Sequence, residues 1–396
     1  MAIVKILIAP DKFKGSLNAR AVAENIAAGL REVLPEAKID IVPMADGGEG
    51  TAEVICDALE GSWVKCKAHD PLGREIDCRY GYIDNGAGRS RATWTGKPER
   101  VDEPGGESIN RKLAVMEMSE AAGMRRVQPN ERDVDLAGTF GVGEMLLEAA
   151  RHGAREIIIG LGGSATNDGG FGMARALGFR FFDQRSNELT GRVSELFGLK
   201  RIEKPKILAL PKIIAAADVR NPLLGENGAT RVFGPQKGAT EDKIDILERA
   251  LTKLADVVSK DLGVDYRDES GAGAAGGLGF GLMSFCGAKI RPGFDVVAEA
   301  VGLKSKMEDV DLVITGEGSL DVQTLEGKTP AGVARLARRL GKHVFAIVGR
   351  ASEDRQVREI FDGVYELSEP GMSEQENMAR AAELLREKAR ALANAL

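Results

Sequence analysis

Four loops of this chain combine glycines with acidic, basic and hydroxyl side chains, the residue types that phosphoryl transfer to an alcohol requires. In that reaction cationic groups hold the phosphates, carboxylates hold magnesium, and an acidic residue often takes the hydroxyl proton. The loops lie at 11–16, 44–50, 162–170 and 316–329. Their candidate residues are Asp11, Lys12, Lys14, Ser16, Asp46, Gly47, Gly48, Glu49, Gly163, Ser164, Thr166, Asn167, Asp168, Glu317, Asp321, Lys328 and Thr329.

Each loop follows a short β-branched strand pattern and precedes a helical pattern of period 3.6. The strand patterns read KILIAP, IDIVP, REIIIGL and DLVIT. Strands that alternate with helices indicate a parallel sheet covered on both faces. Loops at the carboxyl edge of such a sheet meet where backbone amides and helix N-termini bind anions. One glycine loop alone is more often a turn, but four that also carry charged side chains favour a phosphate site.

Two short stretches resemble known nucleotide-binding motifs, but the residues around them do not fit either motif. Residues 271–276 spell GxGxxG, but the preceding DYRDES is no buried strand, so a dinucleotide site is not indicated and close helix packing is the better interpretation. Residues 327–329 read GKT, but Val322 stands where a P-loop needs its first glycine. Thr329 is nevertheless a candidate helix cap, which would place Lys328 beside a helix N-terminus. A solvated surface lysine is the alternative.

The composition is that of an ordinary globular protein. The 396 residues carry 54 basic and 60 acidic side chains, giving a formal net charge of −6. Because these charges are mixed, no broad basic surface for nucleic acid or an anionic membrane is expected, and a small-molecule substrate is favoured. The four cysteines and three histidines show no zinc spacing. The chain opens on a strand pattern without signal-peptide features, so we expect a cytoplasmic protein. The sequence leaves open whether the protein forms a homo-oligomer.

The length predicts two domains. Residues 63–83 alternate polar and apolar side chains around a proline–glycine turn, which is typical of antiparallel strands. Residues 86–112 are polar and rich in glycine and proline, and we expect them to form a long exposed loop. A final helix is expected from Ser373 to about Leu392, opened by a capping box of Ser373 and Glu376.

Strand–loop–helix units stand at the beginning, middle and end of the chain, so the second domain must be inserted in pieces. We therefore expect an α/β protein with a discontinuously inserted second α/β domain and a site in the cleft between the two. The first domain is expected to comprise 1–62, 133–179 and 285–396, and the inserted domain 63–132 and 180–284.

Six blocks, in order along nearly the whole chain, resemble the type I glycerate kinases. They are APDKFKGSLNA, PMADGGEGT, GLGGSATNDGGFGMARALG, ADVRNPLLGENGATRVFGPQKGAT, GAGAAGGLGFGL and TGEGSLDVQTLEGKTPAGVA. The resemblance implies a Rossmann-like (flavodoxin-like) parallel-sheet domain with an inserted α/β domain. It also implies transfer of the γ-phosphoryl group of ATP, with Mg²⁺, to D-glycerate, most often at the 2-hydroxyl. Asp218 and Lys237 lie in the fourth block and are expected to contact phosphate or substrate.

Residue types and resemblance together give working roles. Lys14 and Lys328 are expected to hold phosphate or the glycerate carboxylate. Asp46, Asp168 and Asp321 are candidates for proton acceptance, and the last two also for magnesium. The third loop is expected to cradle phosphate.

Three residues depart from the family pattern. Ser319 replaces the arginine of TGEGR, Lys12 replaces the serine of PDSFK, and Glu326 stands where a basic residue is common. The changes at Ser319 and Glu326 keep a related hydroxy acid open as the acceptor. Formation of 3-phosphoglycerate also stays open, because transfer to either hydroxyl needs the same residue types. A non-catalytic ligand-binding descendant is an alternative of another class.

Overall fold

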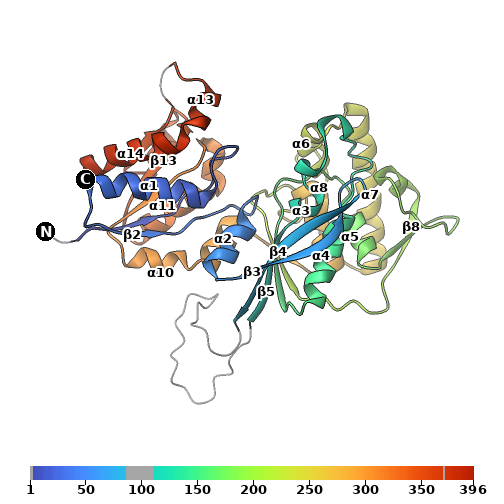
Figure 1. Cartoon of the computed structure of the whole chain (residues 1–396). Coiled ribbons are helices and arrows are strands. Elements are labelled where there is room, and N and C mark those ends of the chain that lie inside the picture. The colour runs from blue at the N-terminus through green and yellow to red at the C-terminus, as the bar shows by residue number, and fades with distance from the viewer. Residues whose placement is uncertain (1–2, 86–110, 369–370) are drawn as a thin grey trace, which may run out of the picture.

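The computed structural model describes residues 3–85, 111–368 and 371–396 and places two large sheets in separate lobes (Figure 1). The sheet of the first lobe has five strands in the order β15-β13-β11-β1-β2, and every pair is parallel. Its strands are β1 (Lys5–Ile8), β2 (Lys38–Ile41), β11 (Leu312–Thr315), β13 (His343–Val348) and β15 (Gly363–Glu366).

Strand β1 shows why this sheet carries helices on both faces. Ile6 and Ile8 point into one buried cluster, whereas Leu7 between them points into another. A strand whose alternate side chains are all apolar is stable only between two layers. One layer contains α1 (Ala19–Val33) and α14 (Ala381–Ala395); the other contains α2 (Thr51–Ala58), α9 (Gly293–Ala300), α10 (Leu303–Glu308) and α11 (Thr329–Arg339).

The sheet of the second lobe has six strands in the order β10-β9-β6-β5-β4-β3. Strands β3, β4 and β5 are antiparallel neighbours, and β5, β6, β9 and β10 run parallel. The strands are β3 (Ser62–His69), β4 (Glu75–Asn85), β5 (Arg111–Glu117), β6 (Glu156–Gly160), β9 (Lys212–Ala216) and β10 (Lys289–Arg291). The helices of this lobe include α4 (Phe140–Arg151), the short α5 (Phe171–Ala176), α7 (Glu241–Leu262) and α8 (Ala274–Cys286).

Short elements complete the described chain. The helices are α3 (Ser119–Ala122), α6 (Ala229–Phe233), α12 (Arg355–Arg358) and α13 (Glu374–Ala379), with 3-10 turns η1 (Met124–Arg126), η2 (Pro129–Glu131), η3 (Val193–Gly198), η4 (Pro235–Lys237) and η5 (Val322–Glu326). Two-stranded sheets pair β7 (Arg180–Asp183) with β8 (Leu199–Glu203) and β12 (Ser319–Leu320) with β14 (Arg350–Ala351). No helix among the described residues is long and apolar enough to cross a membrane.

Helices α2 and α9 lie between the lobes and join their cores. Ile55 of α2 and Phe294 of α9 belong to the same buried cluster as Val313 of the first sheet and Val115 and Ile158 of the second. An apolar core that continues from one sheet to the other couples the positions of the lobes.

One assignment from the sequence is corrected by the sheet pairing. The strand of REIIIGL, expected in the first domain with 133–179, is β6, and it pairs with β5 and β9 of the second sheet. Strand β10, also expected in the first domain, pairs with β9. A strand–loop–helix unit has the same local pattern in either sheet, so only long-range pairing decides its neighbours.

Three further predictions concern the residues 63–83, the loop 86–112 and the C-terminal helix. The antiparallel strands over 63–83 are confirmed as β3 and β4. Of the expected loop 86–112, residues 86–110 lie outside the described residues and the last two belong to β5. The C-terminal helix is divided at Arg380 into α13 and α14, and Ser373 caps α13 by accepting a hydrogen bond from the amide of Glu376 at 3.2 Å.

Residues 271–276 pack closely, as the sequence predicted, and no strand precedes them in this described stretch. A Cβ atom built on Gly276 would lie 1.9 Å from the carbonyl oxygen of Thr166, and the φ of Gly276 is +69°. Only glycine allows this approach. The glycines therefore serve helix packing at the start of α8.

Candidate functional site

Two neighbouring cavities open at the carboxyl edge of the first sheet, and both are lined by the loop after β1. The larger, about 820 Å³, is shared with the loops after β11 and β13. The smaller, about 470 Å³, extends past α2 toward the second lobe. Both lie within the size range of small-molecule sites. Predicted residues that line one or both are Asp11, Lys12, Lys14, Ser16, Asp46, Glu49, Glu317, Asp321 and Lys328.

Asp11 and Lys12 stand between the two cavities. The Asp11 carboxylate accepts hydrogen bonds from the Lys12 amide at 2.6 Å and from the Thr329 hydroxyl at 2.8 Å. Burial raises the pKa of Asp11 to about 6, although Lys12 lowers it. The Lys12 ammonium lies 3.6 Å from Asp11 and 3.9 Å from Asp46. Burial alone would lower the pKa of Lys12, but the surrounding carboxylates raise it, so this side chain stays cationic.

The 44–50 loop is held against the second sheet by its glycines. A Cβ atom on Gly47 would lie 2.9 Å from the carbonyl oxygen of Ala216 at the end of β9, and the φ of Gly47 is +89°. Asp46 accepts a hydrogen bond from the Gly48 amide at 3.0 Å, which orients its carboxylate. The loop therefore fixes Asp46 through contacts made with the other lobe.

Asp218 follows β9 and lies close to the same acidic group. One carboxylate oxygen accepts a hydrogen bond from the Gly293 amide at the start of α9 at 3.0 Å, and the other is buried without a partner among the described residues. Burial, followed by the negative charge of Asp46, raises the pKa of Asp218 to about 8. Its prediction as a substrate-contacting residue stays a prediction.

The fourth loop supplies two carboxylates and a cation to the larger cavity. Glu317 accepts a hydrogen bond from the Thr324 hydroxyl at 2.7 Å, and burial raises its pKa to about 7. Asp321 caps η5 by accepting from the Thr324 amide at 3.2 Å. Lys328 is the N-cap residue of α11, so it stands at a helix N-terminus as expected.

Thr329 does not cap α11 as the sequence suggested. It is the first helical residue, and its hydroxyl donates to Asp11, which ties the fourth loop to the first. Ser319 lines the larger cavity and accepts a hydrogen bond from the Arg350 guanidinium at 3.2 Å. The side chain of Glu326 lies outside the described structure.

The third loop differs from the other three, because its predicted residues line neither of these cavities. Asp168 is 1% exposed and accepts four hydrogen bonds, from the amides of Thr139, Gly170 and Gly172 and from the Thr139 hydroxyl. These contacts occupy the carboxylate in joining α4 to α5. The structure therefore gives Asp168 a structural position.

Its neighbours are buried with it. The Lys237 ammonium donates to the carbonyl of Thr166 at 2.8 Å, and burial lowers the pKa of Lys237 to about 7. Asn167 donates to the Thr230 hydroxyl at 2.9 Å. Gly163 and Ser164 pair with the segment at Gly123 and Met124. None of these residues reaches the two cavities.

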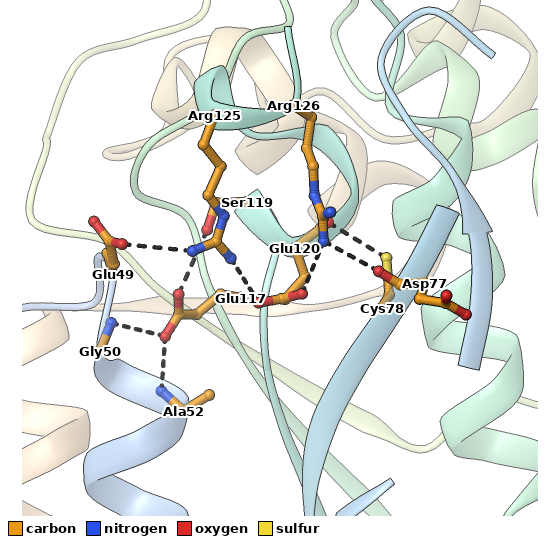
Figure 2. A network of polar contacts seen from close by, with 10 residues as sticks. All are labelled: Glu49, Gly50, Ala52, Asp77, Cys78, Glu117, Ser119, Glu120, Arg125 and Arg126. Atoms are coloured by element: carbon orange, nitrogen blue, oxygen red, sulfur yellow. Dashed lines mark hydrogen bonds and ion pairs between the residues drawn. The ribbon is translucent and has the colours of Figure 1, made fainter. Parts of the chain in front are cut away.

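Sequence reasoning missed a polar network contributed by the second lobe (Figure 2). Glu117, the last residue of β5, accepts hydrogen bonds from the amides of Gly50 at 2.9 Å and Ala52 at 3.1 Å at the N-terminus of α2. The Arg125 guanidinium contacts Glu49 at 3.5 Å and Glu120 at 2.6 Å. The apolar run of β5 could have revealed the strand, but no glycine loop follows it to draw attention to Glu117.

No group of three or more His, Cys, Asp or Glu side chains among the described residues is arranged to hold a metal ion. A divalent cation that takes one or two carboxylates, and completes its shell with phosphate and water, remains compatible with these loops. That is the usual coordination of Mg²⁺.

Known proteins similar to this chain point to one family. The family model of the glycerate kinase family matches residues 6–396. A glycerate kinase of Halalkalibacterium halodurans is 39% identical, covering 98% of this chain and 97% of that protein. The glycerate 2-kinase of Escherichia coli K12 is 41% identical, covering 89% and 86%. A Salmonella typhimurium LT2 crystal structure, assigned as glycerate kinase 2, aligns with a TM-score of 0.82 and 39% identity over 100% of this chain and 98% of that one.

Proposed function

Because the chain belongs to the glycerate kinase family, we propose that it transfers the γ-phosphoryl group of ATP to the 2-hydroxyl of D-glycerate. One observation carries the proposal beyond the family: loops from three parts of the chain bring carboxylates and cations to two cavities that share Asp11 and Lys12. Two adjoining cavities suit a donor and an acceptor that must meet in line.

We assign the nucleotide to the larger cavity. It opens between β1 and β11, where the strand order of the first sheet reverses direction, and ligands of open parallel sheets bind at such a point. Lys328 at the N-terminus of α11 and Lys14 in the first loop then supply positive charge to the phosphates. Ser319, in place of the expected arginine, leaves Arg350 as the guanidinium beside it.

Magnesium fits the acidic side of the same cavity. Asp321 lines it and offers the hard oxygen ligands that Mg²⁺ prefers. The bound ion would neutralise charge on the phosphates. Asp168, an earlier candidate for this role, is not included because four hydrogen bonds already occupy its carboxylate.

The acceptor is assigned to the smaller cavity, with its hydroxyl at the boundary near Lys12. Asp46, 3.9 Å from the Lys12 ammonium, is then the candidate to take the hydroxyl proton. Lys12 would hold the negative charge that collects there as phosphate and acceptor approach. We infer that the reaction takes place in the cytoplasm, where ATP is supplied, by a monomer or a homo-oligomer.

Incubation with D-glycerate, ATP and Mg²⁺, followed by enolase without phosphoglycerate mutase, tests the product. Phosphoenolpyruvate forms only from 2-phosphoglycerate, so its appearance supports the proposal. ADP release without phosphoenolpyruvate would point to the 3-hydroxyl. A panel of hydroxy acids tests the acceptor, and faster turnover of another acid than of D-glycerate would contradict it. Ligand binding without ADP release would instead support a non-catalytic protein.

A further inference from the structure

We propose that Arg125 recognises the carboxylate of the acceptor, so that it sets the specificity of this site for a hydroxy acid. The inference rests on the proposed function. Arg125 lines the smaller cavity together with Lys12 and Glu117. It comes from η1, which follows β5 of the second lobe along the chain, and it shares this cavity with Lys12 and Lys14 of the first lobe. A carboxylate is bound best by a guanidinium, which can donate two parallel hydrogen bonds.

The Arg125 guanidinium is held in place by an ion pair with Glu120 (Figure 2). One of its terminal nitrogens lies 2.6 Å from Glu120, whose side chain is only 18% exposed. Arg126 fixes Glu120 in turn, with its guanidinium 3.1 Å from the Glu120 carboxylate and 2.7 Å from the Glu120 carbonyl oxygen. A guanidinium oriented by such partners loses little freedom when it binds a ligand.

The other terminal nitrogen of Arg125 has a weaker partner. Glu49 lies 3.5 Å away, and its side chain is 59% exposed. Exposed ion pairs of this length contribute little to stability. The Glu49 carboxylate therefore makes only a weak contact at the position that a substrate carboxylate would take. It can rotate toward the solvent when the substrate binds.

Several other possible anchors in this cavity are already engaged, although Lys14, assigned here to the phosphates, and Lys306 also line it. The amides of Gly50 and Ala52, at the N-terminus of α2, donate to Glu117, so this helix end is occupied. The Arg20 guanidinium lies 3.1 Å from Asp57. That of Arg79 stacks 4.2 Å over the Trp63 ring.

The position of Arg125 also fits the proposed direction of transfer. Lys12, at the boundary between the cavities, lines the smaller cavity together with Glu49, Glu117 and Arg125. A short hydroxy acid held at Arg125 by its carboxylate would have its hydroxyl groups in the same cavity as Lys12.

Steady-state kinetics of Arg125→Met with D-glycerate and with the neutral analogue D-glyceramide test the proposal. We expect the KM for D-glycerate to rise about 10- to 100-fold, as for the loss of hydrogen bonds to a charged group. The KM for ATP and the kcat/KM for D-glyceramide should change less than about threefold, since neither uses the carboxylate contact. Arg125→Lys keeps the positive charge but cannot donate two parallel hydrogen bonds, so it should give an intermediate KM.

Two more variants serve as controls. Arg20→Met removes a positive charge from the same cavity and should change the KM for D-glycerate less than about threefold, because Arg20 is paired with Asp57. Glu49→Gln removes the competing carboxylate and should lower that KM. Thermal unfolding of each variant checks that the folded protein is being compared.

The outcomes separate the two proposals. A wild-type protein without activity on D-glycerate overturns the proposed function and this inference with it. An active wild type, combined with an unchanged KM in Arg125→Met and Arg125→Lys, overturns this inference alone. An equal loss with D-glycerate and D-glyceramide would also overturn it, because the carboxylate would then not be the group recognised.

Discussion

The second and third glycine-rich loops look alike in sequence and differ in the folded protein. Both follow a strand, and each contains an aspartate next to a pair of glycines. Asp46 of the second loop lines a cavity, and its side chain is 30% exposed. Asp168 of the third loop is buried under four hydrogen bonds. The same residue type therefore lines a cavity in one loop and joins two helices in the other.

The difference lies in what covers each strand end. Loop 44–50 is pressed between the lobes, with Gly47 against β9, and this leaves Asp46 at the rim of the larger cavity. Loop 162–170 is covered by α8, whose left-handed turn at Gly276 lies directly on Thr166. A carboxylate under such a cover must satisfy its oxygens within the protein, because burying it unpaired would be costly.

The largest effect on kcat is expected from Asp46→Asn, which removes the partly exposed aspartate of the second loop. If Asp46 takes the hydroxyl proton, kcat should fall about 100- to 10,000-fold, the usual contribution of a general base. The midpoint of thermal unfolding should change by less than about 2 °C, because Asp46 makes one backbone hydrogen bond that asparagine can replace. Near wild-type kcat in Asp46→Asn would remove Asp46 from the reaction.

Asp168→Ala should show the opposite behaviour. It leaves three buried backbone amides and one hydroxyl without an acceptor, so we expect the free energy of unfolding to fall by about 3 kcal/mol or more. The KM for both substrates should stay close to that of the wild type in the fraction that is folded. Urea unfolding with activity measurements checks both quantities, and a stable but inactive Asp168→Ala would reverse our assignment.

Asp218 has a buried carboxylate oxygen and lies close to the site, and its ionisation should make the stability of the protein depend on pH. Its pKa is raised to about 8 in the folded protein, whereas it is about 4 in an unfolded chain. The folded state therefore binds more protons between these values, and stability is fully present below pH 4 and lost as pH rises through 8. Without ligands, we expect the wild type to lose on the order of 1–2 kcal/mol relative to Asp218→Asn between pH 5 and 9.

Parallel unfolding curves of the wild type and Asp218→Asn at each pH provide the measurement. A constant difference between the two proteins across this pH range would show that Asp218 is already ionised at low pH. In that case the buried oxygen without a partner could not be the reason for its raised pKa.

The smallest change is expected in the pH profile of Lys12→Ser, which restores the serine of the family pattern and whose kcat should also fall because Lys12 is assigned to hold negative charge. Lys12 lowers the pKa of Asp11, so its removal should raise that pKa further. If ionised Asp11 is required, the acidic limb of the kcat/KM profile should move to higher pH by about one unit or less, as expected for a partly solvated charge pair. An unmoved limb would separate Asp11 from catalysis.

Much of the fold was predictable, because strands and helices follow from local patterns. The β-branched strand KILI, the antiparallel strands over 63–83 and the capping serine at 373 are all found as expected. All four glycine-rich loops were expected to meet; the first, second and fourth do, since they follow parallel strands of one sheet, and the third does not. The placement of β6 was wrong, because its local pattern suits either sheet.

For the site, the sequence by itself determined which residue types are available and which of them follow a strand end. Asp11, Lys12 and Lys328 could be named in this way, because a strand–loop–helix unit is a local feature. Only the tertiary structure decided that Asp168 is buried by α8 and that Glu117 and Arg125 reach the cavity from the second lobe. Burial and contact between distant segments depend on which sheets and helices pack together, and no short stretch of sequence contains that information.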